Sequence, residues 1–74
     1  VEALVISKRT HVSHRRRHGR MHSHSSTSYY VTFEVESGDR MELNVNGSEY
    51  GLLAEGDAGK LKFQGTRYLG FDRI

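Results

Sequence analysis

The side chains best suited to chemistry in this sequence are five histidines within its first 24 residues. His14, His18 and His22 lie four residues apart, and His24 follows His22 by two. A spacing of four places imidazoles on one face of a helix and a spacing of two on one edge of a strand, and either arrangement can bind zinc, copper or nickel. The arginines between them repel a metal cation, and no nearby carboxylate is available to orient an imidazole. A metal site at His14, His18, His22 and His24 is thus a hypothesis that the local charge disfavours.

The same segment carries most of the positive charge. Residues 1–24 contain six basic side chains and one acid, a net charge of +5, whereas residues 25–74 contain five basic side chains and eight acids, a net charge of −3. Clustered cations bind phosphates or anionic lipid head groups with an affinity that falls as salt rises, and protonation of the histidines near pH 6 would strengthen the attraction. The polar composition itself favours a solvated linker without a binding role, and polyanion binding is the functional interpretation set beside it. The predicted polyanion-binding residues are Lys8, Arg9, Arg15, Arg16, Arg17 and Arg20.

Several other activities find little support in the sequence. There is no cysteine to act as a thiolate nucleophile and no phosphate-binding loop, dinucleotide-binding glycine pattern or HExxH zinc motif. All five histidines lie in or beside one polar segment, which offers no rigid frame for a Ser-His-acid assembly. We therefore predict a protein that is not an enzyme and needs no cofactor.

The tyrosines raise the alternative of an oligonucleotide-binding barrel. Bases can stack on exposed aromatic rings, and Tyr30 and Tyr68 are out of phase with the inward-facing residues of their predicted strands. However, the sheet around them carries Glu34, Glu36 and Glu42, which would repel a phosphate backbone. Nucleic acid is therefore a less favoured partner than an anionic lipid or a cell-wall polymer.

The element that must hold this segment in place is a β-hairpin over residues 29–45. Apolar and polar residues alternate along both of its arms, as expected of an antiparallel sheet with one face on a core. Residues directly opposite one another share a face, so the loop must contain an odd number of residues. We predict the loop Glu36-Ser37-Gly38, with Gly38 in the left-handed region, and a loop of residues 37–39 is the alternative. The predicted pairs are Phe33 with Met41, Val31 with Leu43, Tyr29 with Val45, and Glu34 with Arg40.

The remaining elements are short. A first strand is predicted over residues 3–12, a long flexible loop of low complexity over 13–28, one helical turn over 48–53 capped by Ser48, and strands over 60–64 and 67–73. Leu69 and Phe71 are predicted to face inward in the last strand, with Gly70 at a bend or bulge. Residues 1–74 thus form a single all-β domain, a five-stranded antiparallel barrel of SH3-like or OB-like type.

The runs YYVTFEVESGDRMEL and SEYGLLAEGDAGKLKFQGTRYLGFDR, with the opening VEALVISKRTHVS, resemble the bacterial family called domain of unknown function 2500. Members are typically small proteins of Gram-positive bacilli with an N-terminal membrane helix and one β-rich domain. The resemblance implies a membrane-associated domain, with the extracytoplasmic side favoured, whose anchor precedes Val1. It implies no activity, ligand or functional residue. We therefore expect a binding or accessory module, with self-pairing through a strand edge as a second mode of interaction.

Overall fold

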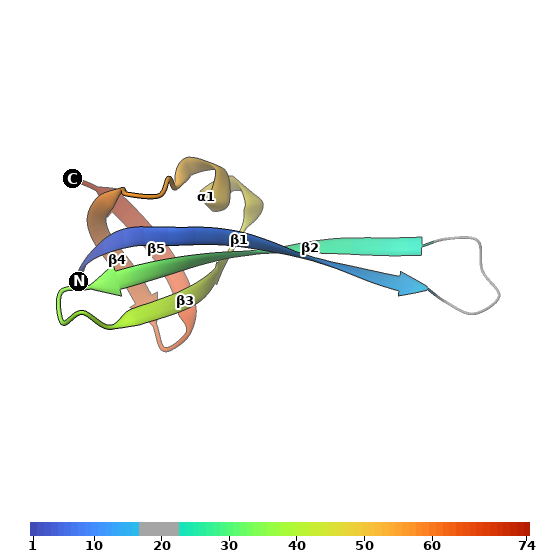
Figure 1. Cartoon of the computed structure of the whole chain (residues 1–74), viewed down its shortest axis with the longest axis horizontal. Coiled ribbons are helices and arrows are strands. Elements are labelled where there is room, and N and C mark those ends of the chain that lie inside the picture. Colours follow the sequence, from blue (N-terminus) through green and yellow to red (C-terminus); the bar gives the residue numbers. More distant parts are fainter. Residues whose placement is uncertain (17–22) are drawn as a thin grey trace.

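A computed structural model describes residues 1–16 and 23–74 and shows a small β-barrel from which two strands project as a ribbon (Figure 1). Five strands and one helix are present in the described residues. They are β1 (Glu2–Arg16), β2 (Ser23–Val35), β3 (Arg40–Val45), α1 (Gly47–Leu52), β4 (Ala58–Gln64) and β5 (Arg67–Arg73).

The barrel closes in the strand order β1-β2-β3-β5-β4, which confirms the predicted five-stranded barrel. One junction differs from the prediction, because β3 and β5 run parallel and meet at the single pair Asn44 and Arg67. The other four junctions are antiparallel. The segment between β3 and β5 returns the chain across the barrel, so these two strands meet in the same direction and the sheet is mixed.

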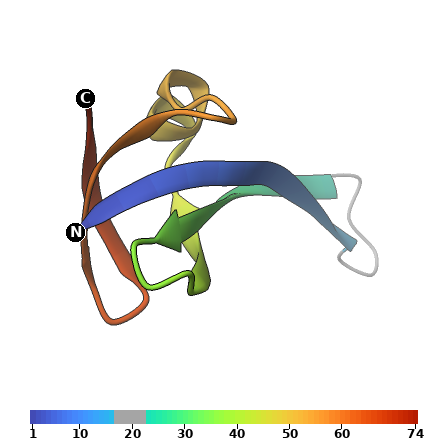
Figure 2. The ribbon, with the colours of Figure 1, turned by 60° about the vertical axis from the view of Figure 1, so that its left-hand side comes forward.

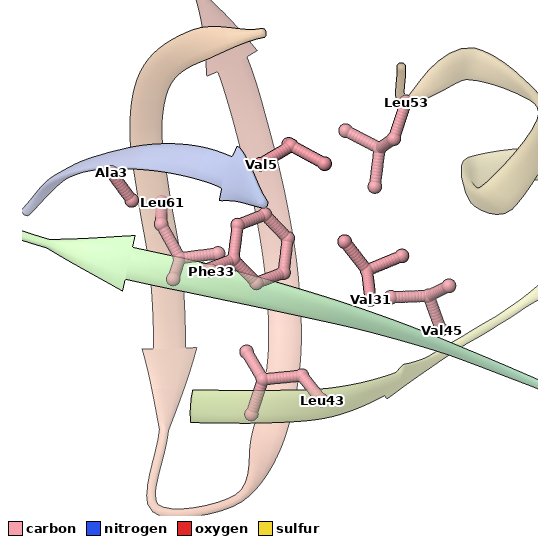
Figure 3. Packing of buried hydrophobic residues seen from close by; sticks show 8 residues of the cluster. All are labelled: Ala3, Val5, Val31, Phe33, Leu43, Val45, Leu53 and Leu61. Atoms are coloured by element: carbon pink, nitrogen blue, oxygen red, sulfur yellow. The ribbon is translucent and has the colours of Figure 1, made fainter. Parts of the chain in front are cut away.

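Eight apolar side chains fill the barrel (Figure 3). Phe33 is fully buried, and its ring packs against Tyr68 and Phe71 of β5 at centroid distances of 6.0 and 5.6 Å. Each strand apart from β5 contributes to this buried set. In β2 and β3, the two strands of the predicted hairpin, the buried residues all lie on one face, as the alternation of the sequence predicts. The buried residues are Ala3, Val5, Val31, Phe33, Leu43, Val45, Leu53 and Leu61.

The predicted hairpin register is confirmed. All four predicted pairs are present, from Tyr29 opposite Val45 to Glu34 opposite Arg40. The Val35 N–H donates to the Asp39 carbonyl oxygen at 2.9 Å, and the Gly38 N–H donates to the Val35 carbonyl oxygen at 2.8 Å. Gly38 has a φ of 88°, so the three-residue loop ends on a glycine in the left-handed region as predicted.

The helical turn lies one residue earlier than predicted, at Gly47–Leu52, and its N-cap is Asn46 instead of Ser48. The Asn46 side-chain oxygen accepts a hydrogen bond from the Glu49 N–H at 2.8 Å and so satisfies one of the free donors at the helix start. Leu53 is buried, and Tyr50 packs against the same core. The helix therefore covers one end of the barrel.

Two β-bulges shift the phase of the strands. In β1, Val5 lies opposite Phe33 and Ser7 opposite Thr32, so Ile6 is the extra residue. In β5, Tyr68 lies opposite Phe63 and Gly70 opposite Lys62, so Leu69 is extra.

The bulge beside Gly70 confirms one prediction and corrects another. Leu69 is 54% exposed, whereas Tyr68 and Phe71 pack on the core, so the prediction that Leu69 faces inward is wrong. The extra residue reverses the alternation between positions 68 and 71.

The predicted flexible loop over residues 13–28 is wrong for its described parts. β1 continues to Arg16 and β2 begins at Ser23, and the two strands stay in antiparallel register through thirteen pairs that end with Arg16 opposite Ser23. We call Thr10–Arg16 and Ser23–Ser28 the arm; it projects well beyond the barrel in both views (Figures 1 and 2). The composition argument considered only apolar burial, whereas strands already paired in the barrel extend their ladder without a core. Residues 17–22 lie outside the described residues.

Candidate functional site

Lys8 belongs to the predicted polyanion-binding set, but the structure places it at the base of the arm and against the barrel. The bulge at Ile6 places Lys8 opposite the fully buried Val31. Its Nζ donates to the Leu53 carbonyl oxygen at 2.5 Å and lies 4.2 Å from the centre of the Tyr50 ring. A carbonyl at the end of a helix and the face of an aromatic ring both stabilise a cation. Lys8 therefore joins β1 to α1.

Arg9 holds the opposite face of the arm base. Its guanidinium makes two hydrogen bonds to the Glu42 carboxylate, at 2.7 and 2.6 Å, and lies 4.2 Å from the centre of the Tyr30 ring. These hydrogen bonds raise the pKa of Arg9 and lower that of the Glu42 carboxyl. Because the Glu42 carboxylate already balances the charge of its guanidinium, Arg9 attracts an external anion less strongly than the sequence predicts.

The predicted cations that extend beyond the barrel are those near the end of the arm. Arg15 lies opposite His24 in the backbone register, and Arg16 lies opposite Ser23. Arg17 and Arg20 fall outside the described residues. The structure thus divides the predicted set into two residues that fix the arm to the barrel and two that the arm carries away from it.

The structure gives only backbone positions for two of the predicted metal ligands, so the metal site stays a prediction. In the backbone register His14 lies opposite Ser25 and His24 lies opposite Arg15. Among residues 1–13 and 26–74, whose side chains the structure describes, no group of three His, Asp or Glu side chains has the arrangement of a metal site. His18 and His22 lie outside the described residues.

The tyrosine rings proposed for base stacking each contact another side chain. Tyr29 and Tyr50 pack together at a centroid distance of 5.0 Å, and Tyr30 lies beneath Arg9. Tyr68 is half-buried, not exposed as predicted, and its hydroxyl donates to Glu49 Oε2 at 3.1 Å. Burial, assisted by the Glu49 charge, raises the pKa of Tyr68 well above its usual range. These contacts make the tyrosines parts of the packing between strands and helix.

A shallow hollow lies at the barrel end remote from the arm. Its volume is about 330 Å³, and its lining includes Glu2, Glu34 and Glu36 beside Leu4 and Ile74. The N-terminus lies at this same end (Figure 1). The hollow and the arm therefore lie at opposite ends of the molecule, whose longest dimension is 51 Å.

The functional role that the sequence did not reveal is the attachment of the arm by Lys8 and Arg9. Both residues look like members of one cationic cluster. Consecutive residues of a strand face opposite sides, and the extra residue Ile6 places Lys8, instead of Arg9, on the side of the buried Val31. The change from an apolar to a polar pattern at Ser7 marks where β1 leaves the barrel, and it is the only signal in the sequence that points to this site.

Comparison with known proteins places the chain in a family and a fold. Residues 1–72 match the family described as "Protein of unknown function (DUF2500)". A crystal structure from Proteus penneri ATCC 35198 has a TM-score of 0.82 and 28% identity, over 99% of this chain and 90% of that one. An X-ray structure of DUF2500 from Klebsiella pneumoniae has a TM-score of 0.71 and 22% identity, over 99% of this chain and 92% of that one.

No curated protein matches the sequence. The expected association with Gram-positive bacilli finds no support in the sources of these two structures. The family match over nearly the whole chain confirms the resemblance seen in the sequence. The chain belongs to the DUF2500 family of proteins of unknown function.

Proposed function

We propose that this domain is a non-enzymatic binding module whose arm contacts an anionic polymer. The observation that carries the proposal is the position of the charge. Residues 10–28 contain four arginines and no acid, a charge of +4, whereas the rest of the chain sums to −2. The arm, which is the described part of this segment, projects beyond the barrel (Figure 1). An anion that meets the arm therefore encounters cations without the repulsion of the barrel carboxylates.

The attachment of the arm supports this role. Lys8 and Arg9 fix its base from opposite faces, one to α1 and the other to Glu42 of β3. A base held on both faces limits the directions in which the arm can point, so less orientational freedom is lost when a ligand binds. The barrel thus acts as the support and the arm as the contact.

The position of the N-terminus favours a polymer over the head groups of a bilayer in which the chain is tethered. Val1 lies at the barrel end opposite the arm (Figure 2). We propose, as the family resemblance implies, a membrane anchor that precedes Val1. With such an anchor the arm points away from the bilayer and toward polymers outside the head-group layer. Across the described residues, no helix is long and apolar enough to span a membrane.

The salt dependence of binding tests the proposal. Four arginine–phosphate contacts on a flexible polyanion give a slope of about −3 in log affinity against log salt, or about a 60-fold loss between 50 and 200 mM. The measurement is a titration of the whole protein with linear polyphosphate by calorimetry at several salt concentrations. A flat dependence would contradict the proposal.

Variants locate the contact. Arg15→Gln with Arg16→Gln should reduce polyphosphate affinity by about tenfold or more and lower the slope by about 1.4. The matched control, Lys60→Gln with Lys62→Gln, removes the same charge from exposed positions of the barrel strand β4 and should change affinity by less than about twofold. Equal losses in the two double variants would show a diffuse charge effect and would refute an arm-specific contact.

Two further probes identify the class of anion. Vesicles containing about one-third anionic lipid should bind more weakly than polyphosphate at equal phosphate concentration, and stronger vesicle binding would transfer the proposal to a membrane surface. A DNA duplex tests the alternative of a nucleic acid, because a two-stranded ribbon fits the major groove. Binding to the duplex that exceeds binding to polyphosphate of equal charge would establish that alternative instead.

A further inference from the structure

The arm has two free edges, and the backbone hydrogen bonds at its base show which groups point to each. The Val35 N–H and carbonyl oxygen bond to the loop that leads into β3. On the other strand, the Val5 N–H donates to the Asp57 carbonyl oxygen, and the Val5 carbonyl oxygen accepts from Gly56, both at 2.8 Å. The backbone N–H and carbonyl groups of Val5 therefore point away from β2. Those of Phe33, which lies opposite Val5, point away from β1.

Backbone groups alternate between the two edges along a strand, and β2 has no extra residue between Ser23 and Val35. The odd-numbered residues of β2 consequently face the β3 side. From Tyr29 onward they pair with β3, but β3 ends at Val45, opposite Tyr29. Ser23, Ser25 and Thr27 thus present N–H and carbonyl groups to an edge that has no partner strand in the described structure.

The second edge of the arm belongs to β1 and differs in charge. Beyond Ser7 it also has no partner strand among the described residues, but β1 carries Lys8, Arg9, Arg15 and Arg16 along this stretch. Natural proteins protect exposed edges from pairing with such charges. The β2 edge, residues 23–28, has the sequence SHSSTS without an acid, arginine, lysine, proline or glycine, and it lacks that protection.

We propose that a second copy of this chain pairs with the β2 edge in antiparallel orientation about a two-fold axis at Ser25. This register places Ser25 opposite Ser25 of the other copy and Ser23 opposite Thr27, so all three edge-facing residues of each copy form hydrogen-bonded pairs. The result is a four-stranded sheet in the order β1-β2-β2-β1, with both charged edges outside. A two-stranded ribbon alone is marginally stable in water, and added strands stabilise it.

A second copy fits this edge better than the β1 edge does. Two β1 edges paired antiparallel would bring Lys8 and Arg9 of one copy beside Arg15 and Arg16 of the other, and like charges on paired strands are destabilising. Pairing through β2 keeps those residues two strands apart. The interface lies below the usual size of about 1,200 Å², so the dimer should be a minor species at about 10 μM and a major one at about 1 mM. The proposal does not depend on polyanion binding.

Two proline variants in one cross-strand pair distinguish the edges. Val12 and Thr27 lie opposite each other, and both have N–H groups that point outward to a free edge. Proline at either position removes an outward donor without breaking the β1–β2 ladder, and it leaves the charge unchanged. In sedimentation velocity at about 0.5 M salt, where the repulsion between arms is screened, Thr27→Pro should stay monomeric up to about 1 mM. Val12→Pro should dimerise like the wild type, and circular dichroism verifies that both variants are folded.

A cross-linking measurement tests the axis without proline. The chain has no cysteine, so a single introduced thiol reports on one position. Directly opposite residues in a hydrogen-bonded antiparallel pair have Cα atoms about 5.5 Å apart, which suits a disulfide. Ser25→Cys should therefore cross-link under mild oxidation at least tenfold faster than Ser28→Cys, whose equivalents would lie about 20 Å apart. A wild type that is monomeric at about 1 mM, dimerisation lost in Val12→Pro but kept in Thr27→Pro, or equal cross-linking rates would each overturn the proposal.

Discussion

Gly59 provides a sharp test of how tightly the barrel is closed. This residue is buried in β4 between two neighbours, opposite Ala3 of β1 on one side and Arg73 of β5 on the other. A Cβ atom at this position would overlap the Asp72 carbonyl oxygen and would lie 2.8 Å from Phe71 Cζ and 2.9 Å from Arg73 Cα. Two of these contacts are backbone atoms of a paired strand, so relief requires β5 to move.

We expect Gly59→Ala to lower the free energy of unfolding by about 3 kcal/mol, at the upper end of the usual cost of overpacking. A chain of this length has a total stability of about 4–11 kcal/mol, so the variant should remain folded but lose a large part of its margin. At about 4–8 °C per kcal/mol for a small domain, the melting temperature should fall by about 12–24 °C. Urea denaturation and thermal melts followed by circular dichroism measure both quantities.

The matched control is Gly51→Ala in α1. A Cβ there meets no atom within 4 Å, and alanine is the better helix former, so this variant should gain about 0.5–1 kcal/mol. If the free energy of unfolding of Gly59→Ala lay within about 0.5 kcal/mol of the wild-type value, β5 would have to shift at little energetic cost. The reasoning from strand packing would then be wrong.

Three more predictions concern the contacts around the base of the arm and the helix. Lys8→Met keeps the aliphatic stem but removes the hydrogen-bond donor to the Leu53 carbonyl oxygen and the cation over the Tyr50 ring. We therefore expect the free energy of unfolding, measured by urea denaturation, to fall by about 1–2 kcal/mol. Arg9→Gln should raise the pKa of Glu42, measured by NMR, toward 4.5. A carboxyl pKa that folding lowers adds stability only above its unfolded value, and this pair is largely exposed, so we expect little change in the free energy of unfolding. An unchanged pKa would contradict the ion pair. Burial and Glu49 raise the pKa of Tyr68 above its unfolded value of 10.0, so the stability that depends on the neutral phenol is complete below that pH and is lost as the pH rises further. Tyr68→Phe should reduce this loss above about pH 10, and a parallel decline in both proteins would argue against a buried phenol.

The parts of the fold that followed from the sequence are those in which a local rule had one solution. Phe33 had to face an apolar partner, which required an odd loop, and Gly38 was the residue suited to its end. The predicted strand over residues 60–64 likewise lies within β4, where alternate residues Leu61 and Phe63 pack on the core. In each case hydrophobic alternation and turn chemistry agreed, and the tertiary structure had no competing requirement.

The parts that did not follow depend on an extra residue or on pairing between distant segments. Nothing local marks Ile6 or Leu69 as extra, yet each reverses the alternation that follows it. The parallel contact between Asn44 and Arg67 exists only once the barrel closes. The arm resembled a solvated loop because its stability comes from the register of two strands fixed elsewhere, which composition does not record.

For the candidate site, the sequence combined residues that have two different positions in the structure. It grouped Lys8 and Arg9 with the arginines that follow them as one polyanion-binding set, and that binding stays a prediction. It could not distinguish Lys8 and Arg9 from them, because the contacts of these two residues with Tyr50 and Glu42 lie more than thirty residues away.

The arm meets the barrel only through its base, and this makes its length adjustable during evolution. Inserting one residue into each strand near the tip would lengthen the arm by about 3.3 Å, and inserting two would also restore the original faces. Neither change would alter the pairs from Ala3 opposite Val35 to Arg9 opposite Tyr30 that attach it. Reach can therefore change in small steps while the barrel, with its thin margin of stability, stays the same.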